Sequence, residues 1–324
     1  MSKVTGSSQV EQAVAMRPGD EPNGISSGPD GTVYLAVPPF VARISPKGKI
    51  DAAVSGLGSG PADGALRGVI ALSSDTVATA NAGQLLRISP DKQSVVLAGI
   101  QHGLRSFTDP VPATQEAATA RFTRYLAPIG TVHDGSLILA DGNALWSLHS
   151  GKLTRLYQHH AIKVAGTDRP SVTAAGSTVS SDGRIYLLPA APKATLKDAV
   201  VISTAGGTGR LDLPDTIKGI PGKPGDLTPL WLASDGGNGV YVHAYSSTDR
   251  GNTQGEFVLH VHEKRGELVA ASHTQGSPET CAVSKPVDAK NFPCPLPWAI
   301  TYQPRRLVMA GGEPYLVRVT LPRH

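Results

Sequence analysis

The sequence predicts an all-β protein, a six-bladed β-propeller with four-stranded antiparallel blades whose last blade is closed by the N-terminal strand. Three observations support this: a repeated four-strand unit, Asp-Gly-type turns between short apolar strands, and a missing strand at one chain end that matches a surplus strand at the other. Of the 324 residues, 36 are Gly and 26 are Pro, and only 17% are charged. All-β domains often reach this length, and Gly and Pro supply their chain reversals.

The repeated unit consists of an apolar strand, an Asp-Gly-type turn, a second apolar strand, a loop, a third strand, a short turn and a fourth strand. In the first unit the second to fourth strands are expected at 32–37, 41–46 and 50–54. The tetrapeptide Arg-Ile-Ser-Pro begins at Arg43 and again at Arg87. This spacing of about 44 residues is close to the period of four-stranded propeller blades. Asp and Gly suit the turns because they tolerate a positive φ.

Four weaker units keep the same order, and the last of them ends after its third strand. Residues 9–15 alternate between apolar and polar and belong to no unit. As the outer strand of the last blade they would remove an open sheet edge. We expect residues 1–324 to form one domain. Its blades are expected near 23–56, 66–99, 125–158, 171–213, 228–272 and 297–322, with the closing strand at 9–15.

The charge pattern argues against a nucleic-acid partner. The formal charge is +4 and the isoelectric point is near 9, but the basic residues are scattered and only 5% of residues are aromatic. Nucleic-acid-binding surfaces instead gather basic residues in a patch. No apolar stretch reaches the length of a membrane span, and residues 1–10 lack the apolar core of a signal peptide. We therefore expect this chain to lack its leader or anchor.

The only two cysteines, Cys281 and Cys294, bracket one Pro-rich segment. This arrangement predicts a local disulfide, because irregular loops gain most from a covalent link. The alternative is a pair of unrelated buried thiols. A disulfide implies an oxidising compartment, so an extracellular or cell-surface location is expected, while a cytoplasmic location stays open.

A family resemblance rests on Asn23-Gly-Ile-Ser-Ser-Gly-Pro-Asp-Gly-Thr-Val-Tyr-Leu-Ala36 and Arg43-Ile-Ser-Pro-Lys-Gly48. These segments resemble the NHL-repeat propellers and, more loosely, the virginiamycin B lyase-like repeats. Residues 109–122 look like the linker that precedes NHL repeats. The motif-level resemblance covers residues 23–157 and implies the propeller fold. It leaves function open, because propellers perform unrelated tasks.

The loops predict where a ligand would bind. Short turns join the first strand to the second and the third to the fourth, whereas the long loops share the opposite face. Those loops span 99–125, 159–170, 189–199, 214–228, 245–256 and 272–297. Long loops on one face of a rigid scaffold are where binding usually occurs. The candidate ligand-binding residues there are Arg105, His159, His160, Asp168, Arg169, Trp231 and Arg250. Each is alternatively an ordinary solvated loop residue.

No catalytic motif is found, and neither a cofactor nor a metal is expected. His260 and His262 share one side of a strand and would need a third ligand to hold a metal. Resemblance to amidating-lyase propellers would imply several His near the channel. Resemblance to calcium-dependent lactonase propellers would imply a Glu on a first strand with inward Asn and Asp, which Glu21-Pro-Asn23 echoes weakly. His243 is expected to be buried and hydrogen-bonded.

These observations favour an extracellular ligand- or protein-binding module over an enzyme. It would hold a protein, peptide or glycan on the long-loop face, as the sensor or adhesion domain of a larger bacterial surface protein. The alternative is a propeller enzyme, a lyase or hydrolase, with its site at the mouth of the central channel. A cluster of His, Asp, Glu or Asn from three or more blades would favour that alternative. A third hypothesis, an intracellular scaffold, requires reduced and distant cysteines.

Overall fold

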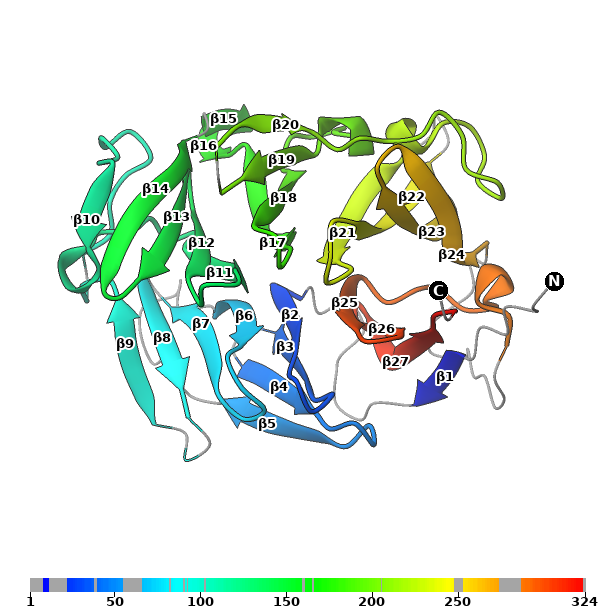
Figure 1. The fold of residues 1–324 in the computed structure, drawn as a ribbon, viewed down its shortest axis with the longest axis horizontal. Helices are drawn as coiled ribbons and strands as arrows, with labels where there is room; N and C mark the ends of the chain where they lie inside the picture. Colours follow the sequence, from blue (N-terminus) through cyan, green and yellow to red (C-terminus); the bar gives the residue numbers. More distant parts are fainter. Residues whose placement is uncertain are drawn as a thin grey trace.

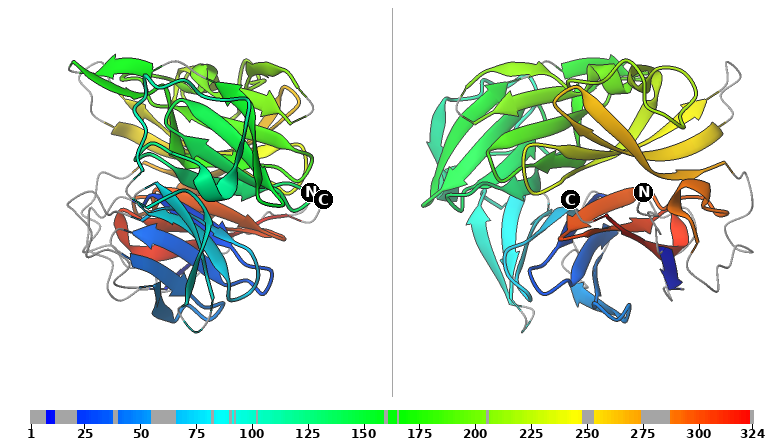
Figure 2. Two further views of the ribbon diagram at one scale, coloured as in Figure 1. Left: turned by 90° about the vertical axis from the view of Figure 1, so that its left-hand side faces the viewer. Right: turned by 45° about the vertical axis from the view of Figure 1, so that its right-hand side comes forward.

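The protein is an all-β propeller in which six antiparallel sheets surround a central channel (Figure 1). The strands of each sheet run between the two faces of the ring (Figure 2). The computed structural model describes residues 8–11, 22–37, 40–54, 66–81, 83–89, 91, 93–101, 103–158, 161–164, 166–204, 206–247, 253–273 and 287–322. The predicted six-bladed all-β fold is confirmed.

Four blades consist of four consecutive strands each, as the repeat predicts. These strands are β2 (Gly24–Ser27), β3 (Val33–Val37), β4 (Phe40–Ile44) and β5 (Ile50–Val54); β6 (Arg67–Ala71), β7 (Val77–Asn81), β8 (Gln84–Ile88) and β9 (Ser94–Ala98); β17 (Val172–Val179), β18 (Arg184–Pro189), β19 (Val200–Ser203) and β20 (Thr208–Arg210); and β21 (Thr228–Ser234), β22 (Val240–Ser247), β23 (Thr253–His262) and β24 (Arg265–Ser272). The first strand of every blade lies next to the channel (Figure 1).

The third blade has five strands, so the prediction of four strands in every blade is wrong there. It contains β11 (Ala127–Thr131), β12 (Leu137–Asp141), β13 (Ala144–His149), β14 (Lys152–Gln158) and, outermost, β10 (Thr114–Glu116). The extra strand comes from the linker before the blade. It pairs antiparallel with β14, with Gln115 opposite Leu153. This pairing covers an edge that would otherwise be open.

The sixth sheet joins the two ends of the described chain. It contains β25 (Ala299–Gln303), β26 (Arg306–Gly311), β27 (Glu313–Thr320) and β1 (Ser8–Glu11). Strand β1 pairs antiparallel with β27, from Ser8 opposite Val319 to Glu11 opposite Leu316.

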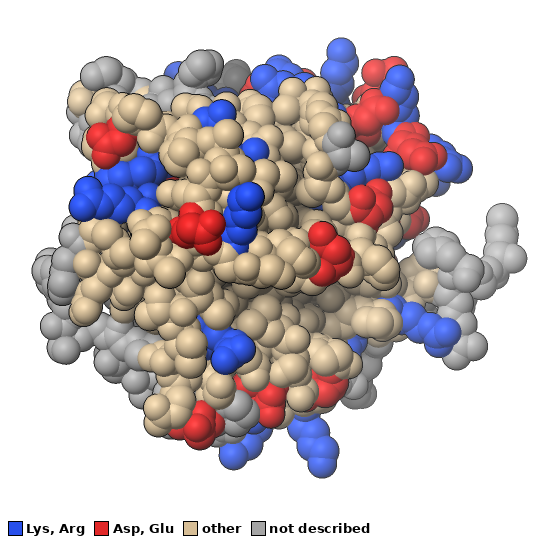
Figure 3. All heavy atoms as spheres, turned by 60° about the vertical axis from the view of Figure 1, so that its left-hand side comes forward, with Lys and Arg blue, Asp and Glu red and all other residues tan. Residues whose placement is uncertain are grey.

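The remaining elements are short and lie between or beside the blades. They are the hairpin β15 (Ala161–Val164) and β16 (Thr167–Pro170) and the 3₁₀ turns η1 (Ala117–Thr119), η2 (Leu196–Asp198), η3 (Pro224–Asp226) and η5 (Ala289–Asn291). Among the described residues no helix is long and apolar enough to cross a membrane. On the face shown in Figure 3, basic and acidic side chains are interspersed rather than gathered into a stripe.

Local sequence explains both the turns and the strands. At the first predicted turn Thr32 N donates to Asp30 Oδ1 at 3.0 Å, and Gly31 has a φ of +83°. The turn at Asp134 repeats this geometry. All residues of β3 and of β12 are buried, because each of these strands packs on both sides against neighbouring blades. Strands buried on both faces are mostly apolar; β3 is apolar throughout, and β12 is apolar except for Asp141.

A row of glycines lets the innermost strands of successive blades approach closely. The row consists of Gly24, Gly68, Gly130 and Gly176, on β2, β6, β11 and β17. A Cβ on Gly24 would lie 2.6 Å from Val69 N on the next inner strand. A Cβ on Gly68, whose φ is +63°, would lie 2.5 Å from Pro128 O. Distances this short leave no room for a side chain, so the row fixes the spacing of the first five inner strands.

Candidate functional site

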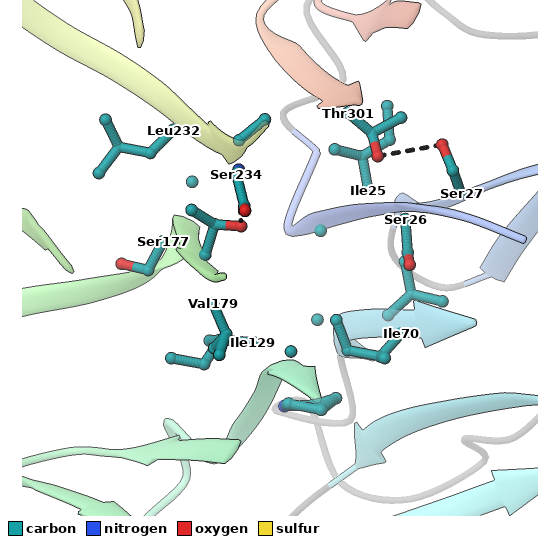
Figure 4. Close-up of a pocket in the computed structure, with 18 of the residues that line it drawn as sticks. Ile25, Ser26, Ser27, Ile70, Ile129, Ser177, Val179, Leu232, Ser234 and Thr301 are labelled. Atoms are coloured by element: carbon teal, nitrogen blue, oxygen red, sulfur yellow. Dashed lines mark hydrogen bonds between the residues drawn. The ribbon is translucent and has the colours of Figure 1, made fainter. Parts of the chain in front are cut away.

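The central channel is lined by the first strands of all six blades and encloses about 310 Å³. Small hydroxyl side chains link its walls (Figure 4). Ser26 Oγ accepts a hydrogen bond from Ala71 N at 3.0 Å, and Thr178 Oγ1 accepts one from Ser234 N at 3.2 Å. None of the described residues that line the channel is charged. The described channel wall therefore offers hydroxyl, aliphatic and aromatic groups but no Asp, Glu, His, Lys or Arg.

A second cavity of about 440 Å³ lies at the mouth of this channel, on the long-loop face. It begins where the inner strands begin, and Asn23, Ala174 and Trp231 line both cavities. Three aromatic residues form its walls: Tyr125, Trp231 and Trp298. A pocket of this size, apolar with a few polar groups, is typical of small-molecule sites.

The charged residues in the described lining of the mouth are all cationic. Arg67 and Arg169 line it, and the structure describes no Asp or Glu there. The guanidinium carbon of Arg67 lies 5.4 Å from the centroid of the Tyr125 ring, and that of Arg124 lies 5.0 Å from it. Both distances are in the range of cation–π attraction. Arg169 is exposed and makes no hydrogen bond or ion pair with any described residue.

Two of the predicted ligand-binding residues, Trp231 and Arg169, lie together at this mouth. Asp168 lies on β16 opposite Lys163. His159, His160, Arg250 and Cys281 lie outside the described residues. The Cys281–Cys294 bond thus stays a prediction, with Cys294 itself fully buried. The sequence does not mark Arg67, Tyr125 and Trp298 as site residues, because their convergence depends on where each inner strand begins.

Arg105 has a structural role rather than a place in the mouth. Its guanidinium lies 2.7 Å from Asp141 Oδ2 and donates to Asn143 Oδ1 at 3.0 Å, with only 6% of the side chain exposed. Asp141 Oδ1 also accepts from Thr123 N and Thr123 Oγ1, both at 2.7 Å. The pKa of Asp141 is raised, because the effect of burial outweighs the opposing effects of Arg105 and Thr123. These contacts tie the loop that carries Tyr125 to the third blade.

Two hydrogen bonds of its main chain fix the position of Trp298. Its N–H donates to Gly311 O at 2.9 Å, and its carbonyl accepts from His243 Nδ1 at 2.9 Å. His243 is fully buried and hydrogen-bonded, as predicted, and burial lowers its pKa to about 4. Its Nε2 has no hydrogen-bond partner among the described residues. The segment just before Trp298 is anchored as well, because Leu296 N donates to Glu256 Oε2 at 2.6 Å.

Glu313 completes this region and is the most perturbed carboxyl in it. It is 8% exposed, and its Oε2 has no hydrogen-bond partner in the part of the chain that is described. Burial, and to a smaller extent the nearby carboxyl of Glu256, raise the pKa of Glu313 to about 7. Tyr315 lies two residues on, on the same side of β27, and its OH donates to Pro295 O at 2.6 Å. No sequence motif marks this cluster.

The described residues do not fit a divalent cation. Of the groups that the lactonase resemblance would require, Asn23 lines the mouth, Glu21 lies outside the described residues, and no described carboxylate joins Asn23. No group of three potential metal ligands occurs in the described ranges. On the opposite face His260 Nε2 lies 3.0 Å from Asp235 Oδ2, and His262 bonds to Asn238. The predicted pair of histidines therefore has polar partners but no third ligand.

Comparison with known proteins gives matches to solved structures. No family model matches the sequence, and no curated protein matches it significantly. Virginiamycin B lyase from Staphylococcus aureus superposes with a TM-score of 0.54 at 14% identity, over 98% of this chain and 100% of that one. A gluconolactonase from Xanthomonas campestris has a TM-score of 0.52 at 13% identity, over 94% and 86%. Regucalcin from Agrobacterium tumefaciens, described as a calcium-binding protein, has a TM-score of 0.53 at 10% identity, over 94% and 93%.

The chain has the fold of these six-bladed propellers. At such identities the likeness shows the fold alone. The neighbours nevertheless contradict the prediction that favoured an extracellular binding module over an enzyme, because the structures that share its fold over nearly the whole chain include a lyase and a gluconolactonase. Membership of the NHL family is not shown, since no family model matches.

Proposed function

We propose that this protein is an enzyme, a lyase or hydrolase, that binds a small-molecule substrate at the mouth of its channel. The observation that supports this most is the 440 Å³ cavity walled by Tyr125, Trp231 and Trp298 and bordered by two arginines. In this proposal a peptide or glycan would be a substrate of the enzyme and not a binding partner. The named neighbours support the two reaction classes.

The arginines suit both reactions. Elimination and ester or lactone hydrolysis each develop negative charge on an oxygen of the substrate. A fixed cation beside that oxygen stabilises the transition state more than the ground state. Arg169 is the best placed for this role, since it lines the cavity and no described residue competes for its guanidinium.

The described lining contains no Asp, Glu or His that could act as a general base. We assign this role to His159 or His160. They directly precede Ala161, which pairs with Pro170, a residue that lines the cavity. Imidazole is the commonest general base near neutral pH.

Turnover assays test the proposal. A panel of lactones, aryl esters and cyclic depsipeptides, including gluconolactone and virginiamycin B, is followed by proton release and by the absorbance of new double bonds, with and without chelator. We expect turnover that falls at least ten-fold in Arg169→Gln and in one of His159→Ala and His160→Ala. Arg87→Gln, at an exposed position on β8, is the matched control. No turnover by the wild type, or full activity in all three variants, would reject the proposal.

Three further features belong to this proposal. The chain forms one propeller domain of the NHL type, and the pairing of β1 with β27 closes its ring. The protein works outside the cytoplasm or at the cell surface, which rests on a Cys281–Cys294 disulfide. Mass spectrometry of alkylated protein, with and without prior reduction, tests the disulfide. Two thiols that alkylate without reduction would remove the support for that location.

A further inference from the structure

The mouth cavity combines flat apolar walls with cationic groups on one side, and this combination restricts its ligand. This inference rests on the proposed function, because it concerns the same cavity. Trp231 is 6% exposed, so its ring is held in place by packing before any ligand arrives. A preorganised aromatic wall binds planar apolar groups at low entropic cost.

Charge is the second restriction. No described residue of the lining is acidic, whereas Arg67 and Arg169 line it and Arg124 lies against the same tyrosine ring. Arg105, the other arginine of these loops, is already neutralised by Asp141. Arg169 differs from it in having no partner among the described residues. An unpaired guanidinium at an apolar cavity is suited to a carboxylate or phosphate, which it can bind through two parallel hydrogen bonds.

A neutral sugar fits this lining less well. Sugar hydroxyls need several side-chain acceptors, and the described lining offers the side-chain oxygens of Asn23, Tyr125 and Thr173. Asn23 also uses its amide to donate to Leu66 O at 3.5 Å.

We propose that the cavity recognises a planar apolar group that carries an anionic substituent, with the ring between the tryptophans and the anion on Arg169. The cavity volume of about 440 Å³ accommodates such a molecule. This assignment names a class of substrate for the proposed enzyme: aromatic or conjugated acids and their esters with a second, reactive carbonyl.

Binding of 2-naphthoate and its neutral analogue 2-naphthamide tests this assignment. The chain has three tryptophans, and two of them line the cavity while Trp146 is fully buried in the third blade. Quenching of tryptophan fluorescence therefore reports on the cavity, and titration calorimetry supplies the affinities. We expect 2-naphthoate to bind at least ten-fold tighter than 2-naphthamide in the wild type.

Three variants test whether Arg169 causes the preference for the anionic probe. Arg169→Gln should bind both probes equally, Arg169→Lys should restore part of the preference, and Arg87→Gln should match the wild type. Equal affinities in the wild type, no binding of either probe, or a preference that survives Arg169→Gln would overturn the inference. Neither probe contains an ester or lactone bond or a leaving group for elimination, so binding is read separately from the proposed turnover. A charge preference without turnover would thus reject the proposed enzyme alone, whereas turnover without the preference would reject this inference alone.

Discussion

Replacing Glu313 with Gln is expected to stabilise the protein at pH 8 and to change little near pH 4. Burial and the neighbouring Glu256 raise the pKa of Glu313 to about 7, from a usual value of 4.5. Between these values the folded state binds more protons than the unfolded state, so stability falls as the pH rises through this window. One pKa unit corresponds to about 1.4 kcal/mol, which gives a cost of up to about 3 kcal/mol at pH 8. Gln removes that cost because it is neutral at every pH.

Thermal unfolding at a series of pH values measures this difference. A gain of up to about 3 kcal/mol should raise the Tm by roughly 5 °C at pH 8 for a chain of this size. Glu263→Gln is the control, since the Glu263 side chain is 58% exposed on the opposite face. A Glu313→Gln variant whose Tm follows the wild type from pH 4 to pH 8 would refute the reasoning, and so would an equal gain in the control.

Three further predictions concern the packing that shapes the channel and its mouth. Gly68→Ala should cost about 1–3 kcal/mol more than Gly135→Ala in chemical denaturation, because both have positive φ but only the first would meet the backbone of the next blade; equal costs would contradict the close-approach argument. Asp141→Asn should cost about 3–5 kcal/mol, since it leaves the charge of Arg105 buried without its partner; a cost below 1 kcal/mol would show that this pair is dispensable. For His243, with a buried pKa of about 4, stability should fall as the pH drops from 6.5 toward 4, because only the unfolded chain is protonated there, and His243→Gln should flatten that slope.

The fold was largely predictable because its signals are local. Strands and turns depend on residues within one hairpin, such as Asp30 and Gly31, and the repeat places successive hairpins in a ring. Strand β10 was missed because its three residues show no apolar alternation; they form a strand only because β14 presents an open edge. A pairing that depends on a partner about 40 residues away leaves no local pattern.

The site was predictable in part for the same reason. Nearness to the predicted long loops sufficed to single out Arg169 and Trp231, although both lie on strands. Arg67 reaches the mouth because it begins β6, and that boundary depends on the register of the sheet. Arg105 was assigned to ligand binding because a loop arginine carries no sign of its partner; Asp141, 36 residues away, occupies it. Function was harder still, since composition and repeats are the same in binding and catalytic propellers.

Gly176, the last glycine of the row, packs closely against β21, the strand that carries Trp231. A Cβ on Gly176 would lie 2.9 Å from Leu230 O and 3.2 Å from the Cα of Trp231. The bore of the channel and the placement of the Trp231 ring are therefore set by the same contacts. A lineage that widened the pore to admit a larger molecule would also displace the wall on which its substrate rests. In this propeller, a change in the width of the channel would therefore also change which substrate the mouth cavity binds.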